Sequence, residues 1–209
     1  MDHASGFHPA AMALKWEAMD FQKRTPLGRP PPVAMDLATL RIIKYPDPRL
    51  HKVCAPVEQL DDELAALARR MLELMREDAG IGLAAPQVGV LRRMFVCNTT
   101  GVPGEDRIIV NPKATLDGGN IVGEEGCLSI PEVTVTVTRR QHCTLDALDV
   151  TGRPVRLTDT DLVARCWQHE CDHLDGRLII DQMLQADQIA NRKALKRLES
   201  DFNRKAPRF

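Results

Sequence analysis

Two histidines and a glutamate form the pattern with the clearest chemistry in this sequence, His169-Glu170-Cys171-Asp172-His173. In a helix, residues four apart lie about one turn apart on the same face, so both imidazoles can bind one metal ion. Glu170 follows directly around the helix and can reach a water held by that ion. The pattern therefore predicts a metal site that activates water for hydrolysis.

A hydrolytic metal site needs a third protein ligand and an open position for water. No histidine or cysteine follows His173, and no motif surrounds the downstream Glu199. Upstream, Cys127 stands in Glu124-Glu125-Gly126-Cys127-Leu128-Ser129-Ile130-Pro131, a constrained loop just before a strand. Its thiolate would give a Cys/His/His set. On the residues alone, Cys127 is more readily interpreted as a small buried apolar side chain.

A third segment consists mostly of small residues, Gly80-Ile81-Gly82-Leu83-Ala84-Ala85-Pro86-Gln87-Val88-Gly89. Glycines let the backbone approach a ligand closely, and the Gln87 amide is suited to donate to a developing oxyanion. The segment is not a dinucleotide fingerprint, because Ala85 stands where the third glycine of G-x-G-x-x-G belongs. By itself, the segment is better interpreted as a tight connection between a helix and a strand.

Taken in order, these three segments resemble the bacterial-type peptide deformylases. The matching stretches are residues 80–87, 125–129 and 168–174, and the similarity extends from about Leu40 to Leu184. The resemblance implies a hydrolase that removes the N-formyl group from the first methionine of a newly made polypeptide and releases formate. It implies nothing for residues 1–34, which have no counterpart in the family.

The resemblance also implies a metal centre. Cys127, His169 and His173 would hold one divalent metal, and Glu170 would take the proton of a water and pass it to the leaving amine. The family is associated with Fe²⁺, and Zn²⁺ or Ni²⁺ are expected in purified samples because ferrous iron oxidises readily. Asp172 is expected to pair with a basic residue, for which Arg139 is the candidate.

The remaining assignments concern the substrate. By resemblance, Gln87 and the backbone N–H of Leu128 stabilise the oxyanion, and Gly82 lines the approach of the formyl-peptide. An apolar pocket for the methionine side chain is expected from residues on one helical face and from the glycine-rich segment, although plain core packing explains the helical ones equally well. The candidates are Ile81, Leu162 and Cys166.

Two other functions fit the helix motif. A zincin-like metallopeptidase would use a different third ligand and would not need Cys127. A non-catalytic structural zinc module would close the site with Cys166 as a fourth ligand, leaving no position for water and no use for Glu170.

The elements that must position these residues follow from periodicity and turn signals. Helices are predicted over residues 61–78, 159–175 and 182–202, and short strands over residues 41–44, 93–97, 108–110, 133–138, 143–150 and 155–157. We therefore expect an α+β fold with mostly antiparallel short strands around a central metal-binding helix, followed by a C-terminal helix.

Length, charge and composition limit the remaining possibilities. The chain has 209 residues, 44% of them hydrophobic, and a net charge of −1, so no global charge draws it to DNA or to an anionic membrane. No apolar run is long enough to span a bilayer, and the N-terminus resembles neither a secretory signal nor a transit peptide. The six cysteines are then expected as thiols or ligands in a reducing cytoplasm.

The chain divides into two parts of different composition. Residues 1–34, which end in Arg29-Pro30-Pro31-Pro32, are predicted to be an appendage or linker, and residues 35–209 a catalytic domain. Basic residues cluster after Arg192, so the last helix is either a solvated amphipathic helix or a contact to ribosomal RNA. The expected partners are therefore an N-formylmethionyl peptide and, through that helix, the ribosome.

Overall fold

The structure is a computed structural model that describes residues 35–205, and the linker predicted over residues 1–34 lies outside this range. Five strands and three α-helices are found within it, together with short 3₁₀ helices that include η2 (Pro48–His51) and η3 (Ala85–Val88). The α-helices are α1 (Asp62–Glu77), α2 (Asp161–Leu174) and α3 (Gln185–Lys205), and the strands are β1 (Gly82–Ala84), β2 (Met94–Cys97), β3 (Arg107–Cys127), β4 (Ile130–Leu148) and β5 (Pro154–Thr160).

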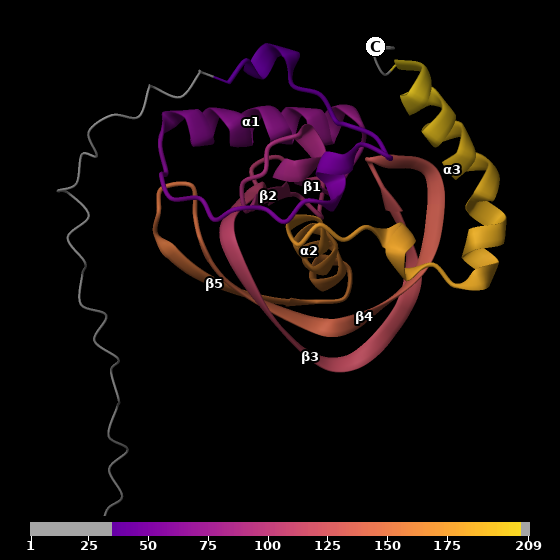
Figure 1. Ribbon diagram of the computed structural model, residues 1–209. Coiled ribbons are helices and arrows are strands. Elements are labelled where there is room, and N and C mark those ends of the chain that lie inside the picture. The colour runs from indigo at the N-terminus through magenta and orange to yellow at the C-terminus, as the bar shows by residue number, and fades with distance from the viewer. Residues whose placement is uncertain (1–34, 206–209) are drawn as a thin grey trace, which may run out of the picture. The chain divides into compact units, whose positions relative to one another are not determined.

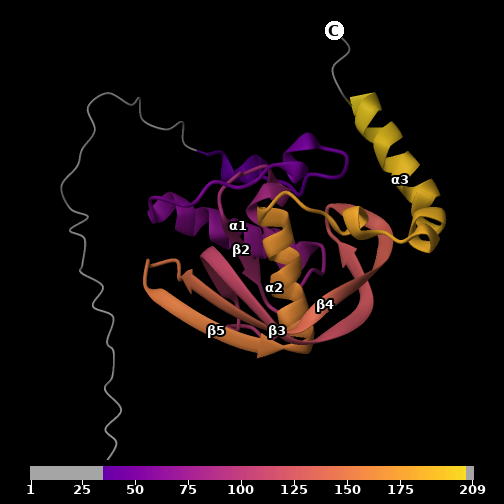
Figure 2. The same ribbon diagram turned by 60° about the horizontal axis from the view of Figure 1, so that its bottom comes forward.

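The strands form one antiparallel sheet in the order β1-β2-β3-β4-β5, so each strand pairs with its neighbour in the chain. In Figure 1 the strands β3, β4 and β5 curve around α2, and Figure 2 shows the same helix within the hollow of the sheet. Helix α2 contacts β1, β4 and β5. The predicted α+β class with a central helix is confirmed.

Two strands are much longer than the predicted fragments. The alternating stretches 133–138 and 143–150 belong to one strand, β4, because Arg139 continues the buried face of Val133, Val135 and Val137. A charged residue at a core position interrupts the apolar pattern but not the strand. The partner strand β3 shifts register between Asp117 and Asn120, which hides its continuity in the same way.

The predicted strand over residues 41–44 is wrong. The segment has no regular secondary structure, and its hydrogen bonds go to two separate places and form no ladder. Ile43 donates to the Gln87 carbonyl at 2.8 Å, and Tyr45 donates to the Ser129 carbonyl at 2.9 Å. The segment therefore ties the glycine-rich stretch to the turn that follows Cys127, which are two parts of the candidate site.

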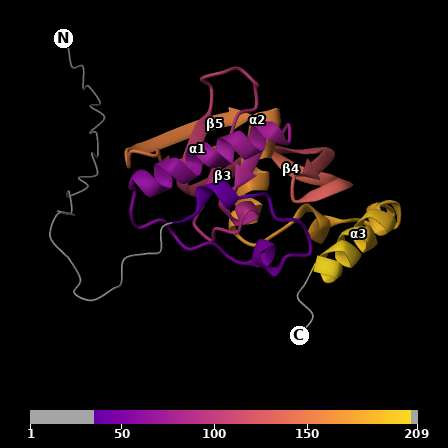
Figure 3. The same ribbon diagram turned by 90° about the horizontal axis from the view of Figure 1, so that it is seen from above.

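Helix α1 forms where its apolar spacing predicts it. The Asp61 carboxylate caps its first turn by accepting from Leu64 N–H at 2.9 Å. Leu67, Met71 and Met75 are buried on one face, which packs against β1 and β2. Figure 3 shows α1 from above. This packing holds the glycine-rich segment, which begins directly after the helix.

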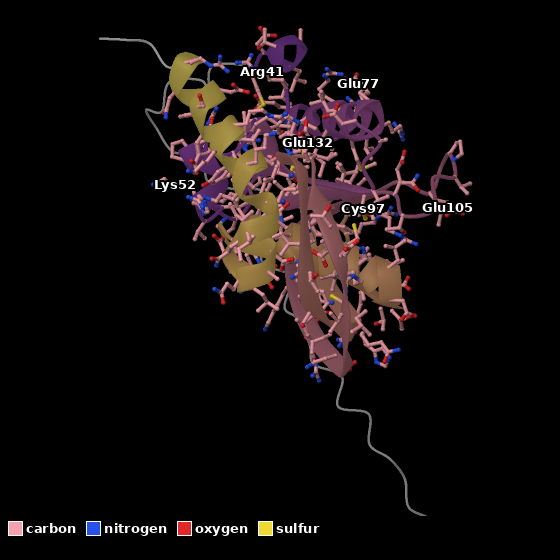
Figure 4. All side chains as sticks on the ribbon, turned by 90° about the vertical axis from the view of Figure 1, so that its right-hand side faces the viewer. Arg41, Lys52, Glu77, Cys97, Glu105 and Glu132 are labelled. Carbon is pink, nitrogen blue, oxygen red and sulfur yellow. The ribbon has the colours of Figure 1, made fainter. Side chains whose placement is uncertain are left out.

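The C-terminal helix α3 packs on the outside of β4, as the side view in Figure 4 shows. Leu198 is buried in this contact, and the Asn191 amide donates to the Thr134 carbonyl at 2.7 Å. Among the described residues, no helix combines the length and the apolar character that a membrane span requires.

Candidate active site

A thiol and two imidazoles meet where α2 passes the end of β3. The ligand atoms of Cys127, His169 and His173 all lie within 4.8 Å of one another. Cys127 Sγ is 3.2 Å from His173 Nε2, and the two rings stand 4.9 Å apart at 76°. Burial lowers the pKa of His173 to about 3, which keeps the imidazole neutral, as a ligand must be.

Glu125 sets the orientation of His169. It lies two residues before Cys127 in β3, and alternation along the strand places both side chains on one face. Its Oε2 accepts from His169 Nδ1 at 3.0 Å, which leaves Nε2 of that ring for the cluster. Burial alone would raise the pKa of Glu125, but the bonds from His169 and Arg139 lower it to about 2. The carboxylate thus fixes the tautomer of His169.

Arg139 joins two carboxylates behind the cluster. Its Nε and Nη2 donate to Glu125 at 3.0 and 2.8 Å, and its Nη1 donates to Asp172 at 2.5 Å. The expected pairing of Asp172 with Arg139 is confirmed. The arginine side chain is only 6% exposed, so this cation connects β3, β4 and α2 in a nearly dry environment.

Glu170 lies beside the cluster with one oxygen unengaged. Its Oε2 is buried and has no hydrogen-bond partner within residues 35–204. Burial raises the pKa of Glu170 to about 7, so this carboxyl can gain or lose a proton near neutral pH. Gly82 faces it from β1, and a β-carbon there would collide with Oε1. Because Gly82 has no side chain, the Glu170 carboxyl can occupy this position.

The amide of Gln87 is aimed at Cys127 by its other contacts. Its Oε1 accepts from Ala84 N–H at 2.8 Å. This bond turns the oxygen end of the amide toward Ala84 and leaves the nitrogen end for the other side. Its Nε2 then lies 3.2 Å from Ser129 Oγ and 3.4 Å from Cys127 Sγ. A buried N–H donor therefore points at the cluster.

A cavity of about 490 Å³ opens beside the cluster. The residues predicted from the sequence that line it are Ile81, Gly82, Gln87, Cys127, Leu128, Leu162, Cys166, His169 and Glu170. Leu162 is 53% exposed and Ile81 40% exposed, so two of the three pocket candidates face the opening and are not packed in the core. Cys166 is buried in the cavity wall.

Cys166 lies outside the group of ligand atoms, and its thiol donates instead to the Ile81 carbonyl at 3.7 Å. Glu199, the other alternative ligand, lies on α3 and accepts from the Tyr45 hydroxyl at 3.2 Å. Neither the closed four-ligand zinc site nor the glutamate-completed site is therefore assembled among the described residues.

Two residues of the site were not found from the sequence. Glu125 stood in a recognised motif that was predicted to be a loop, but β3 extends through this motif, so Glu125 and Cys127, two residues apart, share one face. Arg165 lines the cavity one helical turn before His169, and it was not among the residues considered from the sequence. The spacing of four residues pointed to it.

This curved sheet around one helix, with a thiol and two imidazoles converging beside a cavity, defines an α+β protein with a three-ligand candidate metal site. A sequence model described as polypeptide deformylase matches residues 39–188. The chain therefore belongs to the polypeptide deformylase family, whose members are enzymes.

Individual relatives agree with this assignment. A peptide deformylase of Alkalilimnicola ehrlichii is 42% identical over 163 residues, which are 78% of this chain and 92% of the relative. One from Neisseria meningitidis serogroup B is 41% identical over 161 residues, covering 77% of this chain and 96% of the relative.

Solved structures show the same fold. The peptide deformylase of Plasmodium falciparum superposes with a TM-score of 0.77 at 34% identity, over 80% of this chain and all of the other. That of Legionella pneumophila gives a TM-score of 0.73 at 38% identity, over 80% of this chain and 99% of the other. These similarities cover the part of the chain that carries the site.

Proposed function

We propose that this protein is a metal-dependent hydrolase that removes the N-formyl group from the formylmethionine of newly synthesised polypeptides and releases formate. The observation that carries the proposal is the convergence of Cys127, His169 and His173 beside the buried carboxyl of Glu170, where Cys127, His169 and Glu170 line one cavity. Family membership supports assignment as a deformylase, and this geometry supports metal-dependent hydrolysis.

The donor set fits a divalent metal. A thiolate and two imidazoles suit Fe²⁺, Zn²⁺ and Ni²⁺, and His169 and Cys127 come from elements that Glu125 and Arg139 hold together. Fe²⁺ is the proposed native metal, with Zn²⁺ or Ni²⁺ taking its place in purified samples. When bound, the metal supplies Lewis-acid activation of water and of the scissile carbonyl.

Glu170 is the proposed proton carrier. Its carboxyl, buried beside the cluster, is proposed to accept a proton from the attacking water, and a pKa near 7 lets the same group return that proton to the departing amine. The protonated carboxyl is neutral, which suits the apolar surroundings that raise its pKa. One residue thus serves as base in the first half of the reaction and as acid in the second.

Gln87 and the backbone N–H of Leu128 are the proposed oxyanion donors. The Gln87 amide is held by Ala84 before substrate arrives, so it need not reorganise when negative charge develops on the formyl oxygen. Leu128 follows Cys127 directly, at the turn between β3 and β4. Donors on both sides of the thiol would then face the formyl oxygen.

The cavity is proposed to hold the start of an extended peptide. Within the part of the chain that the structure describes, β3 pairs only with β4 beyond Val110, and β1 pairs only with β2. A peptide can add as a strand between such edges, with Gly82 giving close backbone approach. Its first side chain would lie between Ile81, Leu162 and Cys166.

Formate release from formyl-Met-Ala tests this function directly. We expect activity from the full chain prepared anaerobically with Fe²⁺, a loss of about 10²- to 10⁴-fold in Glu170→Gln with the metal retained, and loss of the metal in Cys127→Ala. A Glu170→Gln variant as active as the parent chain would contradict the proton-carrier role. A loaded parent chain without formate release would contradict the function itself.

A cytoplasmic location and a ribosome contact are also proposed. All six cysteines are free thiols, which suits a reducing compartment. On α3, the side chains of Arg192, Lys193 and Lys196 are exposed and have no acidic partner among the described residues. An exposed basic stripe on an otherwise nearly neutral protein would attract the phosphates of ribosomal RNA.

A further inference from the structure

Lys44 contacts the turn that follows Cys127. Its Nζ donates to the carbonyl of Leu128, 84 positions away in the chain, at 2.7 Å. This short bond has a charged donor, and charged donors make the stronger hydrogen bonds in proteins. The Lys44 side chain is 40% exposed, so water can solvate the ammonium without this contact. Burial of a charge therefore does not explain the bond, and its effect on the turn becomes the question.

The carbonyl that Lys44 holds belongs to the peptide bond between Leu128 and Ser129. Leu128 carries the backbone N–H that is one proposed oxyanion donor. Ser129 is fully buried, and its Oγ lies 3.2 Å from Nε2 of Gln87, the other proposed donor. One peptide unit is thus connected to both donors, and the Lys44 ammonium fixes its carbonyl.

The two neighbours of Lys44 hold the same segments through their main chain. Ile43 donates to the Gln87 carbonyl at 2.8 Å, and Tyr45 donates to the Ser129 carbonyl at 2.9 Å. Three consecutive residues therefore hold the two segments that carry the donors. Only Lys44 does so with its side chain, so its bond is the one that a substitution can remove.

Two further contacts lie near the end of α1. Asp78, the C-cap residue of α1, places Oδ2 3.5 Å from Lys44 Nζ, which favours this position of the ammonium. Gly80 faces the Leu128 side chain, and a β-carbon there would come within 2.6 Å of Leu128 Cδ1. Lys44 thus holds the carbonyl of Leu128 while the side chain of Leu128 packs over Gly80. Together these contacts restrict how Leu128 can turn.

We propose that Lys44 is a positioning residue that fixes both oxyanion donors before the substrate binds. The proposal rests on the proposed function. The oxyanion forms only when water attacks the formyl carbon, so donors aimed at it act on the transition state more than on the bound substrate. A donor that must first turn into place loses part of this effect, because preorganisation makes such donors effective. Lys44 therefore raises kcat and leaves KM nearly unchanged.

Substitution of Lys44 tests this role. Lys44→Met removes the donor and keeps most of the length of the side chain. On formyl-Met-Ala, we expect the metal-loaded variant to lose about tenfold in kcat, less than the roughly 10²- to 10³-fold for complete loss of one donor, with KM changed by less than about twofold. Lys44→Arg keeps a cationic donor and should recover most of the lost kcat. An unchanged kcat in Lys44→Met, or a loss confined to KM, overturns the proposal.

A second measurement separates positioning from general damage to the fold. Gln87→Ala removes one of the two donors, so Lys44→Met should lower kcat by a smaller factor in that background than in the parent chain. Damage unrelated to the donors would lower kcat by the same factor in both backgrounds, and that result overturns the proposal. Lys52→Met is the matched control, because Lys52 is exposed and its side chain makes no hydrogen bond or ion pair with the described residues. Its kcat should equal that of the parent chain.

Lys44→Ala decides the outcome if Lys44→Met does not fold. It lacks the donor as well, and it places no large apolar side chain at this half-exposed position. The same fall in kcat is expected, and a folded, metal-loaded Lys44→Ala chain with the kcat of the parent chain would overturn the proposal. A loaded parent chain that releases no formate would instead contradict the proposed function, so the two failures are distinguishable.

Discussion

Gly82 and Glu170 come so close that a β-carbon on Gly82 would collide with the Glu170 carboxylate. The two residues lie on β1 and α2, which approach each other at this point because Gly82 has no side chain. The same added atom would meet Cys166 Sγ at 2.9 Å. The glycine therefore sets where the proposed proton carrier stands relative to the cavity.

Gly82→Ala is expected to lower activity without removing the metal. The added methyl group displaces the Glu170 carboxyl, and we expect kcat on formyl-Met-Ala to fall by about 100-fold, within the range for a lost general base. Metal content and thermal unfolding check that the ligands stay in place. Gly119→Ala is the control, since its β-carbon would meet only Gln141 Oε1 at 4.0 Å. Equal activity in the two variants would contradict this role of Gly82.

Arg139→Met is expected to weaken both the fold and the metal site. It leaves the carboxylates of Glu125 and Asp172 buried without their main cation, which costs about 3–5 kcal/mol of unfolding free energy. Metal affinity should fall about 10- to 100-fold, because Glu125 no longer holds His169 firmly. Urea unfolding and metal titration measure the two effects. Arg153→Met, on an exposed pair with Asp149, should change stability by less than about 1 kcal/mol.

Cys166→Ala is expected to keep one metal per chain. Its thiol donates to the Ile81 carbonyl and lies outside the ligand group, so no coordination is lost. Metal analysis of the purified variant beside Cys127→Ala provides the measurement. Should Cys166→Ala lose its metal as Cys127→Ala does, the site would be a closed structural one, and the catalytic proposal would fail.

The acid stability of the chain should depend on Asp47. This carboxylate caps η2 and is bound by Arg49, whose hydrogen bond, against the effect of burial, holds the pKa of Asp47 below its usual value. A lowered folded-state pKa means stability that is present above pH about 4 and is lost as the pH falls through that lower pKa. Asp47→Ala should cost about 1 kcal/mol at pH 6 and progressively less as the pH falls through the lowered pKa of Asp47. Denaturant unfolding across this range gives the comparison, and a pH-independent cost would be the contrary result.

The ribosome proposal can be tested without removing α3, whose Leu198 is part of the core. Reversing the charge of Arg192, Lys193 and Lys196 together should abolish salt-sensitive co-sedimentation with ribosomes while leaving formate release unchanged. Reversing Lys113, Arg153 and Arg156, exposed residues of β3 and of the hairpin between β4 and β5, is the control. Equal co-sedimentation of both variants would exclude α3 as the contact.

Local sequence periodicity was enough to predict the helices and part of the site. The spacing of His169, Glu170 and His173 is itself helical geometry, so their common location on α2 follows from 3.6 residues per turn. The apolar stripe of α1 and its Asp61 cap are local in the same sense. These predictions needed no knowledge of which segments meet, and family resemblance then brought Cys127 to the same site.

The contacts between segments were decided only by the tertiary structure. Family resemblance named Arg139 as the partner of Asp172, but the predicted strands 133–138 and 143–150 left it outside both, and only its burial against Glu125 and Asp172 showed that β4 runs through it. The fit of Arg165 over Gly123 depends on how α2 lies against the curved end of β3. Sequence by itself determined the chemistry available on each element, since that depends on neighbours along the chain. The curvature and register of the sheet decided which side chains meet in the cavity, since those depend on packing between residues far apart in the chain.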